Sequence, residues 1–217
     1  MARGDADAGR AHPVPTWSAI VLAGGRGARL GGADKPGLLL GGRTLVEAVA
    51  SAAATAGASQ IVVVGPPRPE LTAAVPLARC VSEEPAGSGP VPALRAGLAL
   101  ITSPWLALLA GDLPFLRERH LLVLLRAAGP GAGAVLGDDA GEPQWLAGCW
   151  RESSLRTALA GYHGTSLRGL LAPLRPAEIT IPEPGEPPAW LDCDTAHDLA
   201  IARTWAADSG LPREGTR

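Results

Sequence analysis

SAIVLAGGRGARLGGADK, residues 18–35, joins an apolar run to a glycine-rich segment. The apolar run, Ser18 to Ala23, is short and stops at glycine, which predicts a buried strand. Five glycines follow within residues 24–32, and the segment ends at Lys35, the only lysine of the chain. Small residues after a strand let backbone N–H groups approach anionic oxygens closely. We therefore predict a strand followed by a phosphate-binding loop.

The spacing of these glycines excludes two familiar phosphate loops. A dinucleotide fingerprint needs GxGxxG, but Gly25 and Gly27 are followed by Leu30 where the third glycine belongs. A P-loop needs a Gly-Lys dipeptide, which the chain lacks. Arg29 and Lys35 remain as cations suited to a triphosphate. The alternative interpretation is a glycine-rich connector with solvated charges.

Strand and helix patterns alternate along the rest of the chain. Short apolar strands alternating with helices predict an α/β fold with a mainly parallel sheet covered on both faces. We expect strands at residues 18–23, 60–64, 79–82, 105–110, 134–136, 145–150 and 178–181. We expect helices at 44–57, 92–101, 117–128, 152–160, 166–171 and 195–207, the last with Thr195 and Asp198 as a capping box. Residues 38–43 predict a hairpin, and 129–133 and 182–188 predict loops. Ligands of such sheets bind at the carboxyl ends of the strands.

Length and composition limit the protein class. The 217 residues suit one domain at 17–207, between a disordered leader at 1–16 and a flexible tail at 208–217. A net charge of −2 gives no reason to expect a nucleic-acid or membrane partner, and no stretch approaches the ~20 apolar residues of a membrane span. Cys80, Cys149 and Cys193 are odd in number and lack a CxxC pair, so neither a disulfide framework nor a zinc site is expected. We expect a cytoplasmic protein that binds a small molecule.

Asp112 follows the apolar run at 105–110 within the sequence GDLPF. A carboxylate at the carboxyl end of a strand is well placed to hold Mg²⁺, which takes one or two carboxylates together with phosphate oxygens and water. Pro114 stiffens the turn behind it. The alternative is that Asp112 only caps the turn, as aspartate often does.

Weaker signals lie at other predicted strand and helix ends. Glu83 and Glu84 offer acceptors for a ribose or a base, or form a solvated acidic loop. Asp194 is a candidate second metal ligand, although Asp192 and Asp194 also favour the positive end of the helix that follows. Trp145 and Trp150 frame a predicted strand and suit core packing, with stacking on a pterin or a base as the alternative. The four histidines form no recognisable catalytic group in the sequence: His12, His120, His163 and His197.

Five motifs occur in the order found in one enzyme family. They are LAGGRGARLGGADK, LLLGGRTLVEAV, GSGPVPAL, GDLPFL and DCDTAHDLA. From about Trp17 to Ala207 the chain resembles nucleotidyltransferases of the molybdenum cofactor guanylyltransferase type. The resemblance implies a Rossmann-like three-layer α/β/α sandwich that transfers GMP from MgGTP to molybdopterin and releases pyrophosphate. It also implies Mg²⁺ as cofactor, and molybdoenzymes or other cofactor-biosynthesis proteins as partners.

The same resemblance assigns roles to individual positions. The residues expected to contact GTP are Leu22, Ala23, Gly24, Gly25, Lys35, Gly65, Glu84 and Asp112. Lys35, Arg29 and Asp112 are the expected catalytic residues, and Asp112 and Asp194 the expected metal ligands. Glu84 stands where the family usually has aspartate, and Gly65 where asparagine can occur.

Other differences concern the acceptor. The chain has GPVPA where the family commonly has GPLAG, and DCDTAHDL where it has NxNTPEDL. Those family positions face the acceptor half of the cleft. LAGG, as against the LAAG of related cytidylyltransferases, correlates with guanine. The alternatives are a sister enzyme that uses CTP or another phosphorylated acceptor, a non-catalytic nucleotide-binding domain, and a nicotinamide-dependent oxidoreductase. The absence of GxGxxG argues against the oxidoreductase.

Overall fold

A seven-stranded sheet forms the centre of the molecule in the computed structural model, which describes residues 15–24, 34–129, 131–193 and 195–208. Its strand order is β5-β4-β1-β6-β8-β7-β9. In sequence the strands are β1 (Trp17–Leu22), β4 (Ile61–Val64), β5 (Ala78–Val81), β6 (Trp105–Ala110), β7 (Gly133–Gly137), β8 (Pro143–Arg151) and β9 (Ala177–Ile179). All seven predicted strands are therefore confirmed, with small shifts at their ends.

The sheet is mainly parallel, as predicted. Strands β5, β4, β1 and β6 run in one direction, and Ile20 pairs with Val62 on one side and Leu108 on the other. Strand β8 runs antiparallel to both β6 and β7, and β9 runs parallel to β7. Strands β1, β4 and β6 are buried along their whole length, which explains why each is a continuous apolar run.

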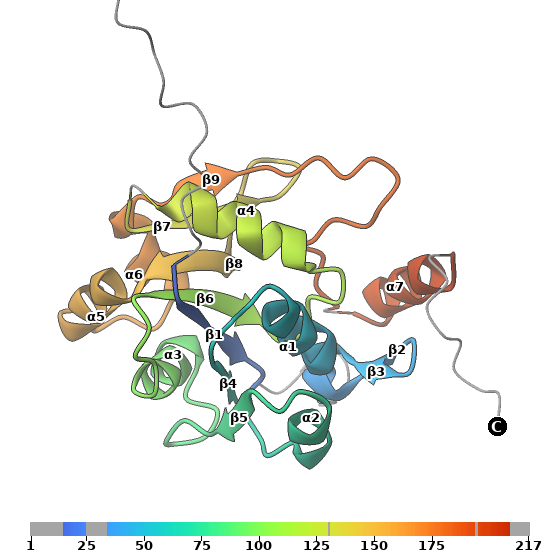
Figure 1. Cartoon of the computed structure of the whole chain (residues 1–217), viewed down its shortest axis with the longest axis horizontal. Helices are drawn as coiled ribbons and strands as arrows, with labels where there is room; N and C mark the ends of the chain where they lie inside the picture. The colour runs from blue at the N-terminus through green and yellow to red at the C-terminus, as the bar shows by residue number, and fades with distance from the viewer. Residues whose placement is uncertain (1–14, 25–33, 130, 194, 209–217) are drawn as a thin grey trace, which may run out of the picture.

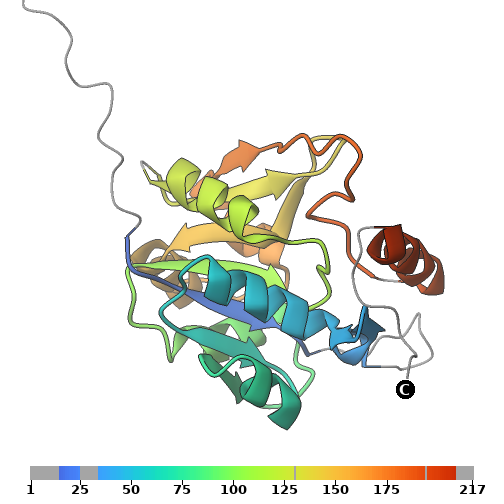
Figure 2. The same ribbon diagram turned by 45° about the vertical axis from the view of Figure 1, so that its right-hand side comes forward.

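Helices cover both faces of the sheet (Figures 1 and 2). One face packs against α1 (Leu45–Thr55), α2 (Pro69–Ala74) and α4 (Glu118–Ala128), and the other against α3 (Pro90–Leu98), α5 (Glu152–Ala160) and α6 (Leu167–Leu171). Neighbours on one strand belong to opposite cores: Val21 packs with the first group of helices and Ile20 with the second. The three-layer α/β/α sandwich is confirmed. The short helix α2 is the one element of these layers that the sequence patterns missed.

A hairpin and the last helix extend the molecule beyond the three layers. Strands β2 (Leu39–Leu40) and β3 (Arg43–Thr44) are joined by Gly41 and Gly42, whose φ angles of 59° and 79° are those of a two-residue hairpin turn. Helix α7 (Ala196–Asp208) lies beside this hairpin (Figures 1 and 2). The predicted capping box is present: the Asp198 carboxylate accepts from the Thr195 N–H at 2.7 Å, and the Thr195 hydroxyl accepts from the Asp198 N–H at 3.1 Å.

Cys193 belongs to the small apolar cluster under α7. This cluster also contains Leu40, Leu45, Phe115, Leu199, Ala202 and Ala206. Burial raises the pKa of the Cys193 thiol to about 12, so the thiol is protonated at neutral pH. A protonated, buried thiol packs as a small apolar group. Cys193 therefore helps to attach α7 and the segment before it to the body of the protein.

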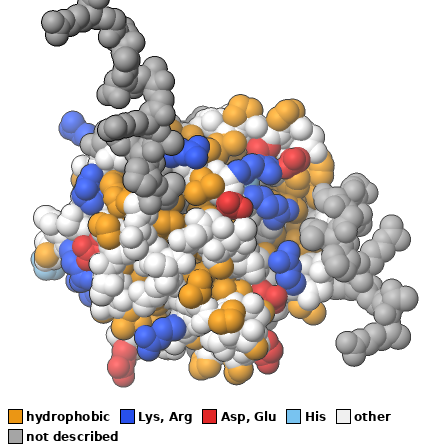
Figure 3. Space-filling view, in the orientation of Figure 1, with side chains coloured by type: hydrophobic (Ala, Val, Ile, Leu, Met, Phe, Trp, Pro, Cys, Tyr) orange, Lys and Arg blue, Asp and Glu red, His pale blue; other side chains and the backbone are white. Residues whose placement is uncertain are grey.

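Charged side chains of both signs are interspersed on the face shown in Figure 3. Within the described ranges, no helix has the length and apolar character needed to cross a membrane. Within the described residues, the short helices η2 (Lys35–Gly37) and η3 (Ala172–Leu174) complete the regular structure. Most of the predicted leader and nearly all of the predicted tail lie outside the described residues.

Candidate active site

Three small residues form a backbone floor where adjacent strands end. The Ala23 N–H donates to the Val64 carbonyl at 2.8 Å, and the Gly111 N–H donates to the Leu22 carbonyl at 2.9 Å. A Cβ on Gly65 would lie 2.7 Å from the Ala23 carbonyl carbon, and one on Gly111 would lie 3.0 Å from the Ala23 Cβ. Side chains at these positions would force the strand ends apart. Small residues there let the ends of β1, β4 and β6 pack closely against one another.

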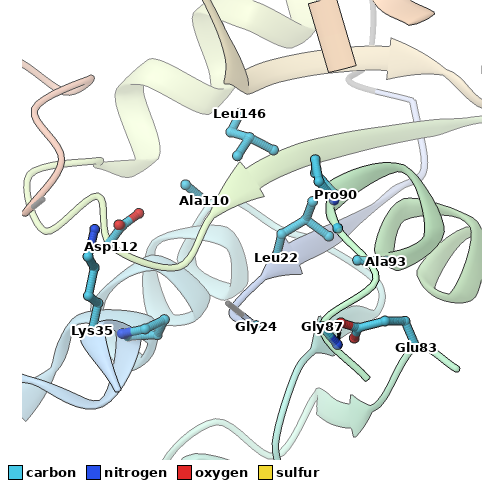
Figure 4. Close-up of a pocket in the computed structure, with 12 residues that line it drawn as sticks. Leu22, Gly24, Lys35, Glu83, Gly87, Pro90, Ala93, Ala110, Asp112 and Leu146 are labelled. Carbon is cyan, nitrogen blue, oxygen red and sulfur yellow. Dashed lines mark hydrogen bonds between the residues drawn. The ribbon is translucent and has the colours of Figure 1, made fainter. Parts of the chain in front are cut away.

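A cavity of about 270 Å³ lies at this edge of the sheet (Figure 4). Its walls come from the ends of β1 and β6, the loop after β5, Leu146 of β8, η2 and the start of α3. The lining residues are Leu22, Gly24, Lys35, Pro36, Glu83, Gly87, Gly89, Pro90, Ala93, Ala110, Asp112 and Leu146. In Figure 4, Lys35 and Asp112 point toward one another at one end, while Glu83 and Gly87 lie at the other. Among the described residues, the cavity thus has a cation beside a carboxylate at one end and a carboxylate without a cation at the other.

Lys35 is the first residue of η2, and a buried arginine fixes the turn that carries it. Arg68 donates to both oxygens of the Asp34 carboxylate, at 2.8 and 2.6 Å, and approaches the Ala23 carbonyl at 3.5 Å. The Arg68 side chain is only 10% exposed. Gly37 lies against the same pair with no room for a Cβ. Arg68 therefore holds both the residue before Lys35 and the end of β1, on either side of the glycine-rich segment.

Asp112 lies one residue beyond Gly111 in the turn between β6 and α4. The Leu116 N–H donates to the Leu113 carbonyl at 3.2 Å, and an Arg117 guanidinium N–H donates to the Pro114 carbonyl at 3.0 Å. These bonds stabilise the turn that presents Asp112 to the cavity. In the part of the chain that the structure describes, no three His, Cys, Asp or Glu side chains gather as a metal site. The available donor set suits a cation held jointly by one or two carboxylates and a ligand's phosphates.

Glu83 lines the cavity, whereas Glu84 does not. Glu83 is 7% exposed, and its Oε1 accepts from the Gly87 N–H at 2.8 Å. Glu84 is exposed and lines a separate surface hollow with Arg95 and His163. Both glutamates were possible acceptors from the sequence, and the family resemblance pointed to Glu84, because two adjacent glutamates give no local signal of which one faces inward. The nucleotide role of Glu84 stays a prediction that this placement does not favour.

Helix α3 begins at the cavity wall after Gly89, whose φ of 105° lies in the left-handed region that favours glycine. The positive end of a helix favours anions. Pro90 and Pro92 carry no N–H, so the first turn offers the Val91 N–H as its main-chain donor. Helix α3 thus contributes mainly the electrostatic preference of its positive end for an anion. Most hydrogen-bond donors to such an anion must come from other residues of the cavity.

A second cavity of about 500 Å³ adjoins the first. The two share Pro90, Ala110, Asp112 and Leu146. The other lining residues of the second are Leu113, Pro143, Gln144, Trp145, Ala147, Ser166, Leu167, Arg168, Trp190 and Asp192. Two indoles, an amide and a guanidinium together suit a flat polar ring system that carries an anionic group. Asp112 lies at the junction of the two cavities.

The structure brings together part of the predicted site. Leu22, Gly24, Lys35 and Asp112 line the first cavity. Ala23 and Gly65 are buried in the packed strand ends beside Leu22 and Gly24 and line neither of the two cavities. Predicted residues outside the described part of the chain are Gly25, Arg29 and Asp194. Arg68 and Arg168 were not predicted, because an arginine in an Arg-rich chain gives no signal of what it contacts.

Comparisons with known proteins place the chain among nucleotidyltransferases. The family model for the MobA-like NTP transferase domain matches residues 19–179. A probable molybdenum cofactor guanylyltransferase from Trichormus variabilis is 33% identical over 190 residues, covering 85% of this chain and 89% of that protein. A solved nucleotidyl transferase from Methanothermobacter aligns with a TM-score of 0.71 and 22% identity, covering 90% of this chain and 99% of that one. The solved 4-diphosphocytidyl-2C-methyl-D-erythritol synthase from Anaerococcus prevotii aligns with a TM-score of 0.66 and 14% identity, covering 89% and 97%.

Proposed function

The chain belongs to the MobA-like NTP transferase family, as its sequence motifs predict, and we propose that it is a molybdenum cofactor guanylyltransferase. It transfers GMP from MgGTP to molybdopterin or the molybdenum cofactor and releases pyrophosphate. The observation that carries this proposal is the position of Asp112 between two adjoining cavities. A transferase needs two substrates side by side with their reacting phosphates at the boundary.

The first cavity suits GTP. Its end with Lys35 and Asp112 takes the triphosphate, because an ammonium neutralises phosphate charge and a carboxylate recruits the accompanying cation. The end with Glu83 takes the ribose or guanine, whose O–H and N–H groups donate to carboxylate oxygens. Leu22 and Gly24 contact the nucleotide between these ends. Support for this orientation is the separation of the two ends in Figure 4.

The second cavity suits the acceptor. A pterin stacks on indole rings, and Trp145 and Trp190 both line this cavity. The Gln144 amide nitrogen donates to the Asp138 carboxylate at 3.0 Å and to the Glu142 carbonyl at 3.3 Å, which leaves the Gln144 carbonyl oxygen as an acceptor for the ring edge. Arg168 neutralises the acceptor phosphate. The alternative stacking role that the sequence left open for Trp145 is part of this proposal.

The reaction is an in-line substitution at phosphorus. An acceptor phosphate oxygen forms a new bond to the α-phosphorus of GTP, and the bond from that phosphorus to the bridging oxygen breaks, so that pyrophosphate leaves. A phosphate monoester is already largely ionised near pH 7, so no general base is needed. Lys35 stabilises the charge that develops on the phosphates, and the protein contributes mainly position and charge neutralisation. Arg29 remains the predicted clamp of the triphosphate.

A single well-placed carboxylate fits the way Mg²⁺ binds nucleotides. Mg²⁺ keeps several waters and takes one or two carboxylates together with substrate phosphates, and Asp112 at the cavity junction provides such a carboxylate. Asp112 would hold the ion, with Asp194 as the predicted second ligand. When bound, Mg²⁺ neutralises phosphate charge.

The compartment and partners are part of the proposal. Cys80, Cys149 and Cys193 are free thiols, which suits a reducing compartment, and we place the enzyme in the cytoplasm. Molybdoenzymes or other cofactor-biosynthesis proteins are the partners to which the product passes.

Pyrophosphate release tests the function. The protein is incubated with Mg²⁺ and each nucleoside triphosphate in turn, with and without molybdopterin. Release that requires both GTP and molybdopterin is the expected result. Release with CTP in place of GTP would identify a cytidylyltransferase, and nucleotide binding without release would identify a non-catalytic domain. Either outcome would overturn the proposal.

A further inference from the structure

A buried histidine near the start of α4 connects two segments of the chain, each of which is continuous with residues that line the second cavity. His120 is 0% exposed. Its Nδ1 accepts from the Arg117 N–H at 2.9 Å, so the ring proton lies on Nε2. That nitrogen donates to the Glu183 Oε1 at 2.6 Å. Burial lowers the pKa of His120, which keeps the ring in this neutral form at pH 7.

The Glu183 side chain is largely buried and makes hydrogen bonds within its own segment as well as to α4. Its side chain is 6% exposed. The second carboxylate oxygen, Oε2, accepts from the Ala189 N–H at 3.0 Å, and Oε1 also accepts from Arg119 at 2.6 Å. The carboxylate therefore joins both ends of the Glu183–Ala189 segment to the first turn of α4.

This network is linked along the chain to residues that line the second cavity. The segment that Glu183 closes continues at once into Trp190 and Asp192, which line the second cavity. Helix α4 follows the turn that carries Asp112, which lines the same cavity. Neither Glu183 nor His120 lines either cavity. The two residues can therefore affect the acceptor only through the segments that they join.

We propose that Glu183 and His120 are positioning residues that hold Trp190 and Asp192 at a fixed place relative to Asp112. An acceptor cavity that is already formed costs less ordering on binding than one that must assemble around its ligand. Apolar packing could hold the segment against α4 without the cost of burying a carboxylate. The hydrogen bonds of Glu183, unlike apolar packing, also fix the orientation of the segment relative to α4. The identity of the acceptor rests on the proposed function; the positioning itself does not.

The decisive variant is Glu183→Gln, with Glu186→Gln as its matched control. Glu186 lies in the same segment and also pairs with Arg119, but it is 59% exposed and the structure gives it no side-chain bond to His120 or Ala189. We expect Glu183→Gln to raise the KM for molybdopterin about tenfold, as changes behind a ligand-binding residue often do, with the kcat and the KM for GTP within about twofold. Glu186→Gln should leave all three constants near those of the unchanged protein.

Conservative and non-conservative changes at His120 add a second test. Glutamine keeps an N–H donor for Glu183 and leucine does not, so His120→Gln should retain more acceptor affinity than His120→Leu. An equal rise in the KM for both substrates in Glu183→Gln, together with a lower Tm, would show a merely structural role and overturn the proposal. Equal acceptor affinity in the two His120 variants would also overturn it.

Hydrogen exchange of the ligand-free protein separates this proposal from the proposed function. Glu183→Gln should speed exchange at residues 183–193 and leave β1 and β4 unchanged, whereas Glu186→Gln should leave both regions unchanged. If the unchanged protein transfers no GMP, the proposed function fails, and this exchange pattern alone decides on the positioning role. Unchanged exchange at 183–193 in Glu183→Gln would overturn it.

Discussion

At the scale of single residues, Lys35 gives the sharpest prediction for activity. Lys35→Ala removes the ammonium that faces the Asp112 end of the first cavity. Loss of a group that stabilises developing phosphate charge lowers kcat by about 10²- to 10³-fold. Pyrophosphate release measures kcat, and thermal unfolding of the same sample should give an unchanged Tm, because Lys35 is partly exposed at the start of a short helix.

Lys35→Arg is the control for charge. It keeps the positive charge but replaces a compact ammonium with a planar guanidinium, so activity should lie between that of Lys35→Ala and that of the unchanged protein. If Lys35→Ala turned over GTP at the normal rate, the catalytic role of Lys35 would have to be abandoned.

Gly65 gives a prediction about the backbone floor. A Cβ at Gly65 would lie 2.7 Å from the Ala23 carbonyl carbon, so Gly65→Ala must push the end of β4 away from the end of β1. Such overpacking typically costs about 1–3 kcal/mol of unfolding free energy, and the displaced floor should raise the KM for GTP. Denaturant unfolding and GTP-dependent kinetics measure the two effects.

Gly161→Ala is the control, because a Cβ there meets nothing within 4 Å and the backbone φ is negative. It should leave the KM for GTP unchanged. An equally small effect of Gly65→Ala would mean that the strand ends are not tightly packed in solution.

At the scale of elements, Arg68 joins the β4–α2 connection to the turn that carries Lys35. Arg68→Gln and Asp34→Asn should each raise the KM for GTP, because each releases that turn. The KM for GTP of the double variant should be little higher than that of either single variant. A double-mutant cycle would then give a coupling energy of about 1 kcal/mol, as expected for a partly exposed pair. Additive effects would show that the two side chains act independently.

The elements themselves were largely predictable because apolar periodicity is a local property. The buried runs at residues 60–64 and 105–110 correspond to β4 and β6, and the spacing at 152–160 to α5. Helix α2 was missed because its six residues, starting at Pro69, span too few turns to show a period. The Arg68–Asp34 pair was missed because its members are 34 residues apart in a chain with many arginines.

At the scale of the whole molecule, the buried pair predicts how stability depends on pH. Burial lowers the pKa of His120 below its ordinary 6.5, although Glu183 acts in the opposite direction and Arg117 and Arg119 add to the lowering. Burial also raises the pKa of Glu183, but hydrogen bonds from Arg119 and His120 outweigh it, and the net pKa lies below 4.5. The unfolded chain therefore binds more protons than the folded protein in acid.

Stability should accordingly be full above about pH 6.5 and fall as pH drops, first through the His120 contribution and below about pH 4.5 through that of Glu183. Each group contributes a slope of at most about 1.4 kcal/mol per pH unit. Urea unfolding between pH 4 and 8 measures this dependence. His120→Gln should flatten the part between pH 6.5 and 4.5, and an unaltered slope would contradict the assignment.

The contact between His120 and Glu183 is an example of a feature that could not be predicted from the sequence. Residues near strand ends were predictable as a group, since parallel strands share one carboxyl edge; Lys35 and Asp112 follow from that rule. Which of Glu83 and Glu84 faces inward depends on the path of the loop after β5. The contact of His120 with Glu183 depends on the packing of α4 against a segment 63 residues later in the chain. Neither fact has a periodic signal.

The antiparallel direction of β8 separates the residues that line the two cavities along the sequence. Because β8 runs against β6, residues 143–147 reach the site as the chain enters the sheet, whereas Leu22 and Ala110 reach it as the chain leaves. Except for Leu146, the first cavity is built from residues up to Asp112, while the residues found only in the second come from 113 and 143–192. Under the proposed function, the nucleotide and the acceptor are therefore recognised by largely consecutive stretches of the chain. Substitutions in the second stretch would then change the acceptor without altering the residues that line only the nucleotide cavity.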